Sequence, residues 1–212
     1  MSDTTEFKAT LTRYLKARIP FISIRSAERS RVLDLLREVV APLNAPVYVH
    51  TLSQGTRELV GGRSVNEDRS VTGAVDFASQ QFAQRQNLSC VLTEVSDIED
   101  DTASARHLLD VVMLAAEHSG VVVVITTKPV WGQLQRAGMA LTLSAPSEDE
   151  MQAIIRENLD AYRGHFPIEW DADDERRAAA ILAGISRIEA ENIIATLLAN
   201  GRITKADMVE LM

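Results

Sequence analysis

Apolar residues in the first two thirds of the chain gather in short runs, and helical patterns separate one run from the next. The runs predict five strands, at residues 19–24, 47–51, 88–95, 121–127 and 139–143. The fourth run is apolar on both faces, as strands in the middle of a parallel sheet are. Strands that alternate with helices predict an α/β fold, with a five-stranded parallel sheet and helices on both faces.

The pattern changes after Ala145-Pro146, because every later apolar repeat has helical spacing. Ser147 to Glu150 and Ser186 to Glu189 both match a capping box, in which a serine and a glutamate satisfy free N–H groups at a helix start. We therefore expect two domains, an α/β domain at residues 1–146 and a small all-helical domain at residues 147–212.

The turn after the first strand carries the most informative local chemistry. In phosphate-binding proteins of this class the turn is rich in glycine, so that backbone N–H groups can surround a phosphate. Here it reads Ser26-Ala27-Glu28-Arg29, with no glycine and no Gly-Lys-Ser/Thr motif. Ser26 is expected to cap the next helix, and the carboxylate of Glu28 would repel a phosphate. The sequence predicts the scaffold of a nucleotide-binding domain without its phosphate-binding turn.

Composition and charge limit the kinds of molecule that the chain is expected to bind. The net charge of −8 argues against a general nucleic-acid binder, because such domains usually present a basic face. The single cysteine, Cys90, lies in an apolar run and is expected to be a buried thiol in a reducing compartment. The first residues show no signal-peptide pattern, and no apolar run approaches the ~20 residues that span a bilayer. We expect a cytoplasmic protein that binds other proteins rather than membranes or nucleic acid.

Several short segments spread over most of the chain carry a family resemblance. They are Arg18-Ile19-Pro20, the turn at residues 26–29, the stretch at residues 143–150, Glu189-Ala190-Glu191-Asn192, Gly201-Arg202-Ile203 and Asp207. With the α/β-then-helical plan they resemble AAA-type ATPases and, more specifically, the N-terminal half of the hypothetical chloroplast open reading frame 46 family. In that family this half resembles a degenerate AAA module, and a module with intact ATPase motifs follows. The resemblance implies that the helical domain is a lid, and that the chain forms a homo-oligomer or assembles with an intact AAA module.

The resemblance also points to candidate site residues. An active AAA protein has a pair of acidic residues near the end of the third strand, for Mg²⁺ and for the attacking water, but here the pair reads Thr93-Glu94. Glu94 is therefore a weak catalytic candidate. Arg25 and Arg29, together with Arg31, are the cofactor-binding candidates in the alternative that the chain binds ATP and Mg²⁺, because guanidinium groups neutralise phosphates. In the leading interpretation this chain has no cofactor and no metal.

Four carboxylates after the third strand have two interpretations. Asp97, Glu99, Asp100 and Asp101 could form a cation site, but we expect them to favour the start of the next helix through its dipole.

Three further positions are also open to interpretation. Thr126 and Thr127 stand where AAA proteins have a polar sensor residue, and they could equally cap the turn that follows. Arg136 stands near the place of an arginine finger, but its neighbours do not match one, so we expect a solvated side chain. The polar stretch at residues 52–71 is long for a loop, and it is either a working surface or a plain surface loop.

These observations lead to three hypotheses about function. The leading hypothesis is a degenerate AAA module, a pseudo-ATPase that serves the assembly or regulation of an AAA ATPase and does not itself hydrolyse ATP. The second is an ATP-binding AAA ATPase with an atypical phosphate site. The third is a clamp-loader-like DNA accessory subunit, against which the acidic net charge counts.

Overall fold

The computed structural model describes residues 4–211, and the chain falls into two compact units. The first is an α/β unit that ends at Leu143, and the second is a helical unit that begins at Ser144. None of the helices at residues 4–211 is long and apolar enough to cross a membrane.

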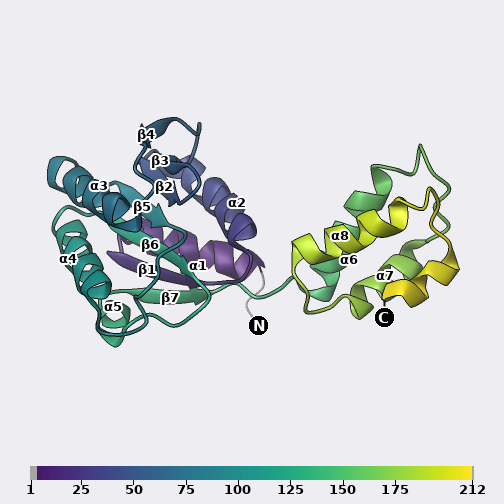
Figure 1. Cartoon of the computed structure of the whole chain (residues 1–212). Helices are drawn as coiled ribbons and strands as arrows, with labels where there is room; N and C mark the ends of the chain where they lie inside the picture. The colour runs from purple at the N-terminus through teal and green to yellow at the C-terminus, as the bar shows by residue number, and fades with distance from the viewer. Residues whose placement is uncertain (1–3, 212) are drawn as a thin grey trace. The chain divides into compact units, whose positions relative to one another are not determined.

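The α/β unit is built on a seven-stranded mixed sheet (Figure 1). Its strands are β1 (Phe21–Arg25), β2 (Val47–Thr51), β3 (Gly55–Glu58), β4 (Ser64–Asn66), β5 (Ser89–Leu92), β6 (Val121–Thr126) and β7 (Met139–Thr142). Their spatial order is β4-β3-β2-β5-β6-β1-β7, and the run from β2 to β7 is parallel. These five parallel strands are the predicted ones. The expected count of five and the all-parallel pairing are wrong, because β3 and β4 extend the sheet.

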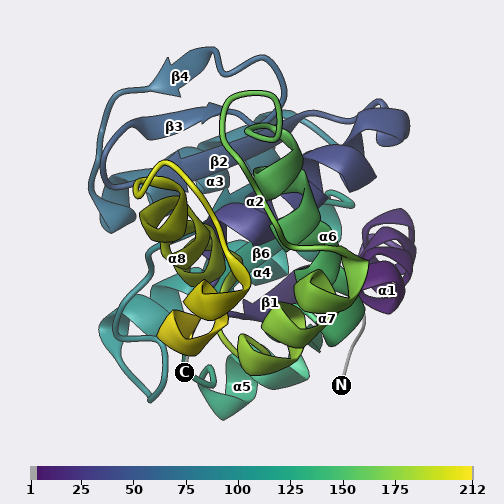
Figure 2. The same ribbon diagram turned by 90° about the vertical axis from the view of Figure 1, so that its right-hand side faces the viewer.

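The two additional strands come from the polar stretch at residues 52–71, which we expected to be a loop. β3 pairs antiparallel with β2, and β4 pairs antiparallel with β3, so the hairpin lies at one edge of the sheet (Figures 1 and 2). Gly55 opens it with a φ of +70°, and a Cβ atom there would lie 2.5 Å from the carbonyl oxygen of Asn66, so the position requires glycine. No apolar alternation marks these strands, because backbone pairing defines them, that of β3 with β2 and that of β4 with β3.

Helices cover both faces of the sheet. The helices α1 (Thr4–Lys16) and α2 (Arg29–Val40) pack on one face, and α3 (Val71–Gln84), α4 (Ala103–Glu117) and α5 (Gly132–Arg136) pack on the other, while a short 3₁₀ turn, η1 (Ala41–Leu43), follows α2. Alternate strand residues face opposite cores, as a pleated sheet requires. The two cores therefore hold the helices to the sheet.

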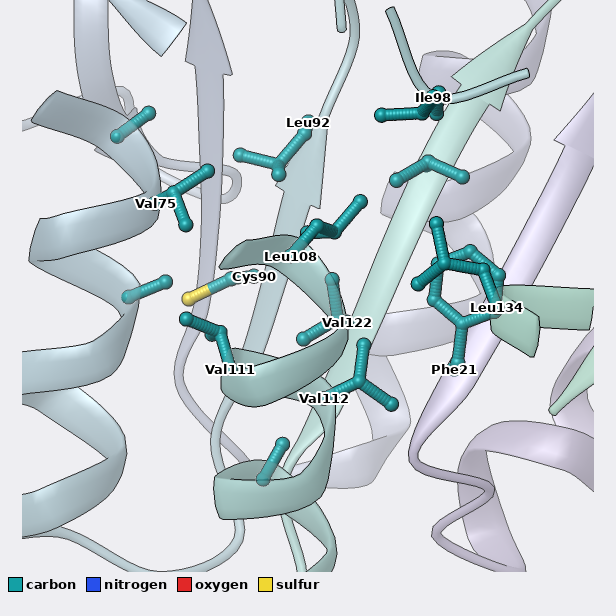
Figure 3. Close-up of a cluster of buried hydrophobic side chains, with 14 of the residues drawn as sticks. Phe21, Val75, Cys90, Leu92, Ile98, Leu108, Val111, Val112, Val122 and Leu134 are labelled. Atoms are coloured by element: carbon teal, nitrogen blue, oxygen red, sulfur yellow. The ribbon is translucent and has the colours of Figure 1, made fainter. Parts of the chain in front are cut away.

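The core under α3, α4 and α5 is shown in Figure 3. Phe21 of β1 lies beside Leu134 of α5, and Cys90 of β5 lies between α3 and α4. Each fully buried apolar side chain of this size contributes about 1.5–3 kcal/mol. The prediction that Cys90 is a buried thiol is confirmed, and burial raises the pKa of that thiol far above its ordinary value.

The helical unit contains α6 (Glu148–Asp160), α7 (Ala172–Ile181), α8 (Arg187–Leu198) and a 3₁₀ segment, η2 (Lys205–Leu211). The predicted capping boxes at Ser147 and Ser186 are both formed, and a third, at Asp171, opens α7. Trp170 is 1 % exposed in the core of this unit, and its indole N–H donates to the carbonyl of Thr204 at 2.8 Å.

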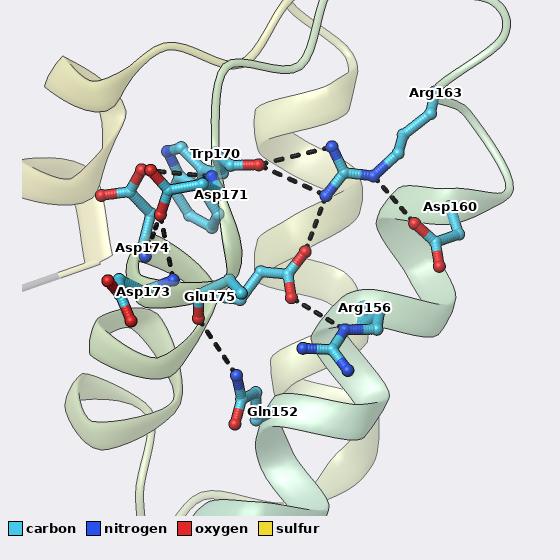
Figure 4. Close-up of polar contacts among 10 residues, drawn as sticks. Gln152, Arg156, Asp160, Arg163, Trp170, Asp171, Asp173, Asp174 and Glu175 are labelled. Carbon is cyan, nitrogen blue, oxygen red and sulfur yellow. Dashed lines mark hydrogen bonds and ion pairs between the residues drawn. The ribbon is translucent and has the colours of Figure 1, made fainter.

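The buried carboxylate of Glu175 in α7 pairs with two partly exposed arginines, one in α6 and one just after it (Figure 4). The carboxylate of Glu175 accepts from Arg156 Nε at 2.9 Å and from Arg163 Nη2 at 2.6 Å. Arg163 also donates to Asp160 and to the carbonyl of Trp170. Because a charged group in a core costs stability unless it is paired, this network explains how Glu175 is buried.

Candidate functional site

A cleft of about 270 Å³ opens at the carboxyl ends of β1, β5 and β6. Its walls are the turn after β1, the segment after β5, and the last residues of β6 with the turn that follows. β1 leads into α2 on one face of the sheet, whereas β6 leads into α5 on the other face. Such a switch point is where open α/β sheets bind ligands, so the topology makes this cleft the candidate site.

The turn after β1 uses its own polar groups to close itself. The backbone N–H of Ser26 donates to the carbonyl of Thr126 at 2.9 Å, and the N–H of Glu28 donates to Ser26 Oγ at 3.1 Å. The helix α2 begins only at Arg29, after Glu28, so the prediction that Ser26 is its N-cap is wrong. The physical reason is that the backbone of Glu28 is not helical (φ −101°, ψ 67°), so the bond to the Ser26 hydroxyl closes a serine turn ahead of the helix.

Glu28 is 5 % exposed, and its carboxylate is compensated within the unit. Arg31 Nη1 donates to Glu28 Oε2 at 2.8 Å, and Arg31 Nη2 donates to Thr4 Oγ1 of α1 at 2.6 Å. Neither Glu28 nor Arg31 lines the cleft. Arg31 therefore holds α1 and the start of α2 together.

Glu94 lies two residues beyond β5 and lines the cleft. One of its carboxylate oxygens pairs with Arg29 Nη1, and the other accepts the backbone N–H of Leu52 at 2.7 Å. Partial burial raises the pKa of Glu94, but the Leu52 hydrogen bond and the charge of Arg29 outweigh it, so the pKa falls below its ordinary value. The carboxylate is ionised at neutral pH and has protein partners on both oxygens.

Thr93, which stands in place of a second carboxylate, is 6 % exposed. Its backbone N–H and its Oγ1–H both donate to the carbonyl of His50, at 3.3 and 2.9 Å. His50, the penultimate residue of β2, is 2 % exposed, and its Nδ1 shares a hydrogen bond of 3.2 Å with Thr56 Oγ1 of the hairpin. We did not anticipate this histidine, and its apolar neighbours in the predicted strand were the only available signal.

Of the other polar residues that the sequence suggested, only some lie at the cleft. The Thr126 hydroxyl closes the turn, because it accepts the N–H of Lys128 and donates to the carbonyl of the same residue. Thr127 lines the cleft. Arg25 and Arg136 are exposed and do not line the cleft, so Arg29 is the arginine that the fold brings to it.

Two of the four carboxylates in the loop after β5 form ion pairs. Asp101 receives two hydrogen bonds from Arg106, at 2.7 and 3.1 Å, and Glu99 lies 3.5 Å from Lys128 Nζ. Thr102 caps α4 through its hydroxyl. Within residues 4–211 no group of three His, Cys, Asp or Glu side chains is arranged to hold a metal ion.

A family model and several solved structures are similar to this chain. A family model described as "SpoVK-like AAA ATPase, N-terminal domain" matches residues 7–143. No curated protein matches the chain.

Solved AAA structures share the fold at low identity. A chain of the Escherichia coli MS115-1 HORMA:CdnC:Trip13 complex is 9 % identical with a TM-score of 0.64, and the match covers 100 % of this chain and 88 % of that one. A Thermotoga maritima RuvB variant is 15 % identical with a TM-score of 0.60, over 100 % and 70 % of the two chains. The FIGL-1 AAA domain in complex with ADP is 10 % identical with a TM-score of 0.58, over 90 % and 70 %.

Proposed function

This chain belongs to the family of SpoVK-like AAA ATPase N-terminal domains, and from that premise we propose that it is a degenerate AAA module, a pseudo-ATPase that serves the assembly or regulation of an AAA ATPase. The observation that carries the proposal is the cleft, in which the phosphate-binding turn is replaced and both carboxylates, those of Glu94 and Glu99, already form ion pairs. On this proposal the chain needs no nucleotide and no metal.

The backbone of the turn supports the proposal. A phosphate-binding turn aims successive N–H groups at the ligand. Here the N–H of Ser26 is bonded to the carbonyl of Thr126, and that of Glu28 to the Ser26 hydroxyl. These two N–H groups, which a phosphate-binding turn would offer to its ligand, thus donate to oxygen atoms of the protein instead.

Glu94 supports the proposal from the other wall of the cleft. Activation of Mg²⁺ and water at a triphosphate needs carboxylate oxygens that face the ligand. Both oxygens of Glu94 have protein partners, and Thr93 contributes a hydroxyl that binds the His50 carbonyl. We therefore expect no catalytic role for Glu94.

Isothermal titration with ATP and with ADP, both with Mg²⁺, tests this directly. We expect no saturable heat at about 50 µM protein, which corresponds to a Kd well above the micromolar range. Tight Mg-ATP binding, with turnover that Glu94→Gln abolishes, would refute the proposal.

The second candidate function, an ATP-binding module with an atypical phosphate site, is favoured by one observation. The cleft is lined by two cationic residues, Arg29 and Lys128, and by Thr127. If this function holds, Arg29→Ala weakens ATP binding at least tenfold, whereas Arg25→Ala, outside the cleft, leaves it unchanged.

The likeness to the chloroplast open reading frame 46 family makes the proposal more specific. It suggests a module that works beside an intact AAA module, with the helical unit as its lid, or as part of a homo-oligomer. A similar structure comes from a complex of several proteins, HORMA:CdnC:Trip13, which supports protein partners. Sedimentation of the purified chain, alone and with an intact AAA module, tests assembly.

A further inference from the structure

The two edges of the sheet differ in how they are protected against pairing with another chain. β4 forms one edge with three residues, its register with β3 shifts at Thr56 and Arg57, and charged Arg63 and Glu67 flank it. Short strands, bulges and charges are the devices that block edge pairing. This edge is therefore blocked.

β7 forms the opposite edge with four residues, and it has neither a bulge nor a charge. It pairs in an unbroken parallel register with β1, from Ile22 opposite Met139 to Arg25 opposite Thr142, and within residues 4–211 no other strand pairs with it. The strand contains no charge, proline or glycine. Ala140 and Thr142 are both exposed.

The hydrogen-bond phase of β7 shows which groups face outward. The N–H of Leu143 donates inward to the carbonyl of Arg25 at 3.0 Å. Because bonding direction alternates along a parallel strand, Met139 and Leu141 also bond inward. The N–H and C=O groups of Ala140 and Thr142 therefore point away from the sheet, as a template for a further strand.

The side chains beside this edge define what such a strand would carry. Leu141 packs with the core under α1, and Met139, two residues earlier, shares that face with 42 % of its surface exposed. An added strand would cover Met139 with an apolar residue of its own.

The charge beside the edge is basic, although the whole chain is acidic. The helix α1 packs against β7, and its last turn carries exposed Arg13 and Lys16 and leads to the amino end of β1. Arg136, also exposed, precedes β7 by three residues. We propose that the β7 edge binds an acidic, extended segment of a partner protein by strand addition. The inference rests on this edge alone and holds whether or not the cleft binds nucleotide.

The test uses the full chain labelled with ¹⁵N and a synthetic peptide in which Glu or Asp alternates with Val over eight residues. On titration, we expect the amide signals of Ala140 and Thr142 to shift, and their hydrogen exchange to slow at least tenfold. A peptide with proline at its centre, and one with Lys in place of Glu and Asp, should both bind at least tenfold more weakly.

Variants of the chain distinguish strand addition at the β7 edge from nonspecific peptide binding. Thr142→Pro removes an outward N–H and keeps the inward bonds of Leu141 and Leu143, so peptide binding should weaken roughly two- to tenfold. The N–H of Glu58 donates to the carbonyl of Arg63, so the next residue, Ser64, directs its N–H away from β3. Ser64→Pro is therefore the matched control on the β4 edge and should leave peptide binding unchanged. Arg136→Glu, which leaves the backbone intact, should weaken binding and flatten its salt dependence.

Three results would overturn the proposal. One is slow exchange of Ala140 and Thr142 in the free monomer, which would mean that the edge is already covered. A second is protection that rises with protein concentration and no peptide, which would identify a second copy as the occupant. The third is peptide-induced shifts confined to other strands.

Discussion

His50 is a buried imidazole surrounded by groups from three segments. Burial lowers the pKa of His50, while the Arg69 carbonyl and the carboxylates of Glu94 and Asp68 oppose that shift without cancelling it. The folded chain therefore keeps this histidine neutral at a pH where the unfolded chain has protonated it. The residue links β2, the hairpin and the end of β5 through uncharged contacts.

This shift predicts a pH dependence of stability with a definite sign. Above pH 6.5, the ordinary pKa, the imidazole is neutral in both states and its contribution is full. As the pH falls from 6.5 toward the lowered folded pKa, the unfolded state binds the proton first, and the free energy of unfolding decreases. Denaturant midpoints at pH 7.5, 6.5 and 5.5 measure the decrease.

The matched variant is His50→Gln, in which the decrease between pH 6.5 and 5.5 should disappear. Glu94 and Asp68 also have lowered pKa values, but they lose their contribution only below their ordinary values of 4.5 and 3.8. A midpoint in the wild-type chain that is flat between pH 7.5 and 5.5 would contradict the assignment.

At the scale of single elements, the start of β7 depends on close backbone contact. A Cβ atom at Gly138 would lie 1.8 Å from the carbonyl oxygen of Phe21, whereas one at Gly132 would meet nothing within 4 Å. Gly138→Ala should therefore destabilise the α/β unit by at least about 2 kcal/mol, because backbone has to move. Gly132→Ala should be neutral or stabilising by up to about 1 kcal/mol.

Chemical unfolding of the two variants at one pH measures the contrast. Equal midpoints for Gly138→Ala and Gly132→Ala would show that β7 does not need this contact, and the strand-addition proposal would then lose its rigid template.

The pairing of α6 with α7 depends on Glu175. In Glu175→Ala, Arg156 and Arg163 lose their common partner, but both guanidinium groups are partly exposed and water can reach them. We therefore expect a cost of about 1–3 kcal/mol, below that of a fully buried pair. Arg176→Ala breaks an exposed pair with Asp173 in the same helix and should cost less than about 0.5 kcal/mol.

Thermal melts in a Trp131→Phe background, followed by near-ultraviolet circular dichroism, report on this unit, because the remaining tryptophan, Trp170, lies in its core. A loss in Glu175→Ala no larger than in Arg176→Ala would mean that packing alone holds α6 to α7.

At the scale of the whole molecule, each unit has cores of its own. The α/β unit has one core on each face of its sheet, and the helical unit has a separate core around Trp170. A unit with its own core can lose stability without the other. Hydrogen exchange should therefore show that Gly138→Ala raises exchange in the strands of the α/β unit only, and that Glu175→Ala raises it in the helices of the helical unit only. Equal acceleration in both units for either variant would show that they unfold together.

The sequence by itself determined the five parallel strands, the helices between them, two capping boxes and the missing glycine-rich turn. Each of these features follows from a local sequence pattern, such as apolar periodicity over a strand or a serine three residues before a glutamate. Ser26 shows the limit of that reasoning. Its hydroxyl accepts the N–H of Glu28, but α2 begins only after Glu28, and the local sequence does not specify that starting point.

Only the tertiary structure decided the hairpin at residues 52–71 and the partners of Glu94. The hairpin exists because β2 offers it a backbone edge. Glu94 is engaged because Arg29, which is 65 positions away, and Leu52, which is 42 positions away, both bind its carboxylate. Such contacts join segments that are distant in the chain, so no periodicity records them. The sequence could thus indicate a site without a phosphate-binding turn, while the folded chain alone shows what occupies the groups that remain.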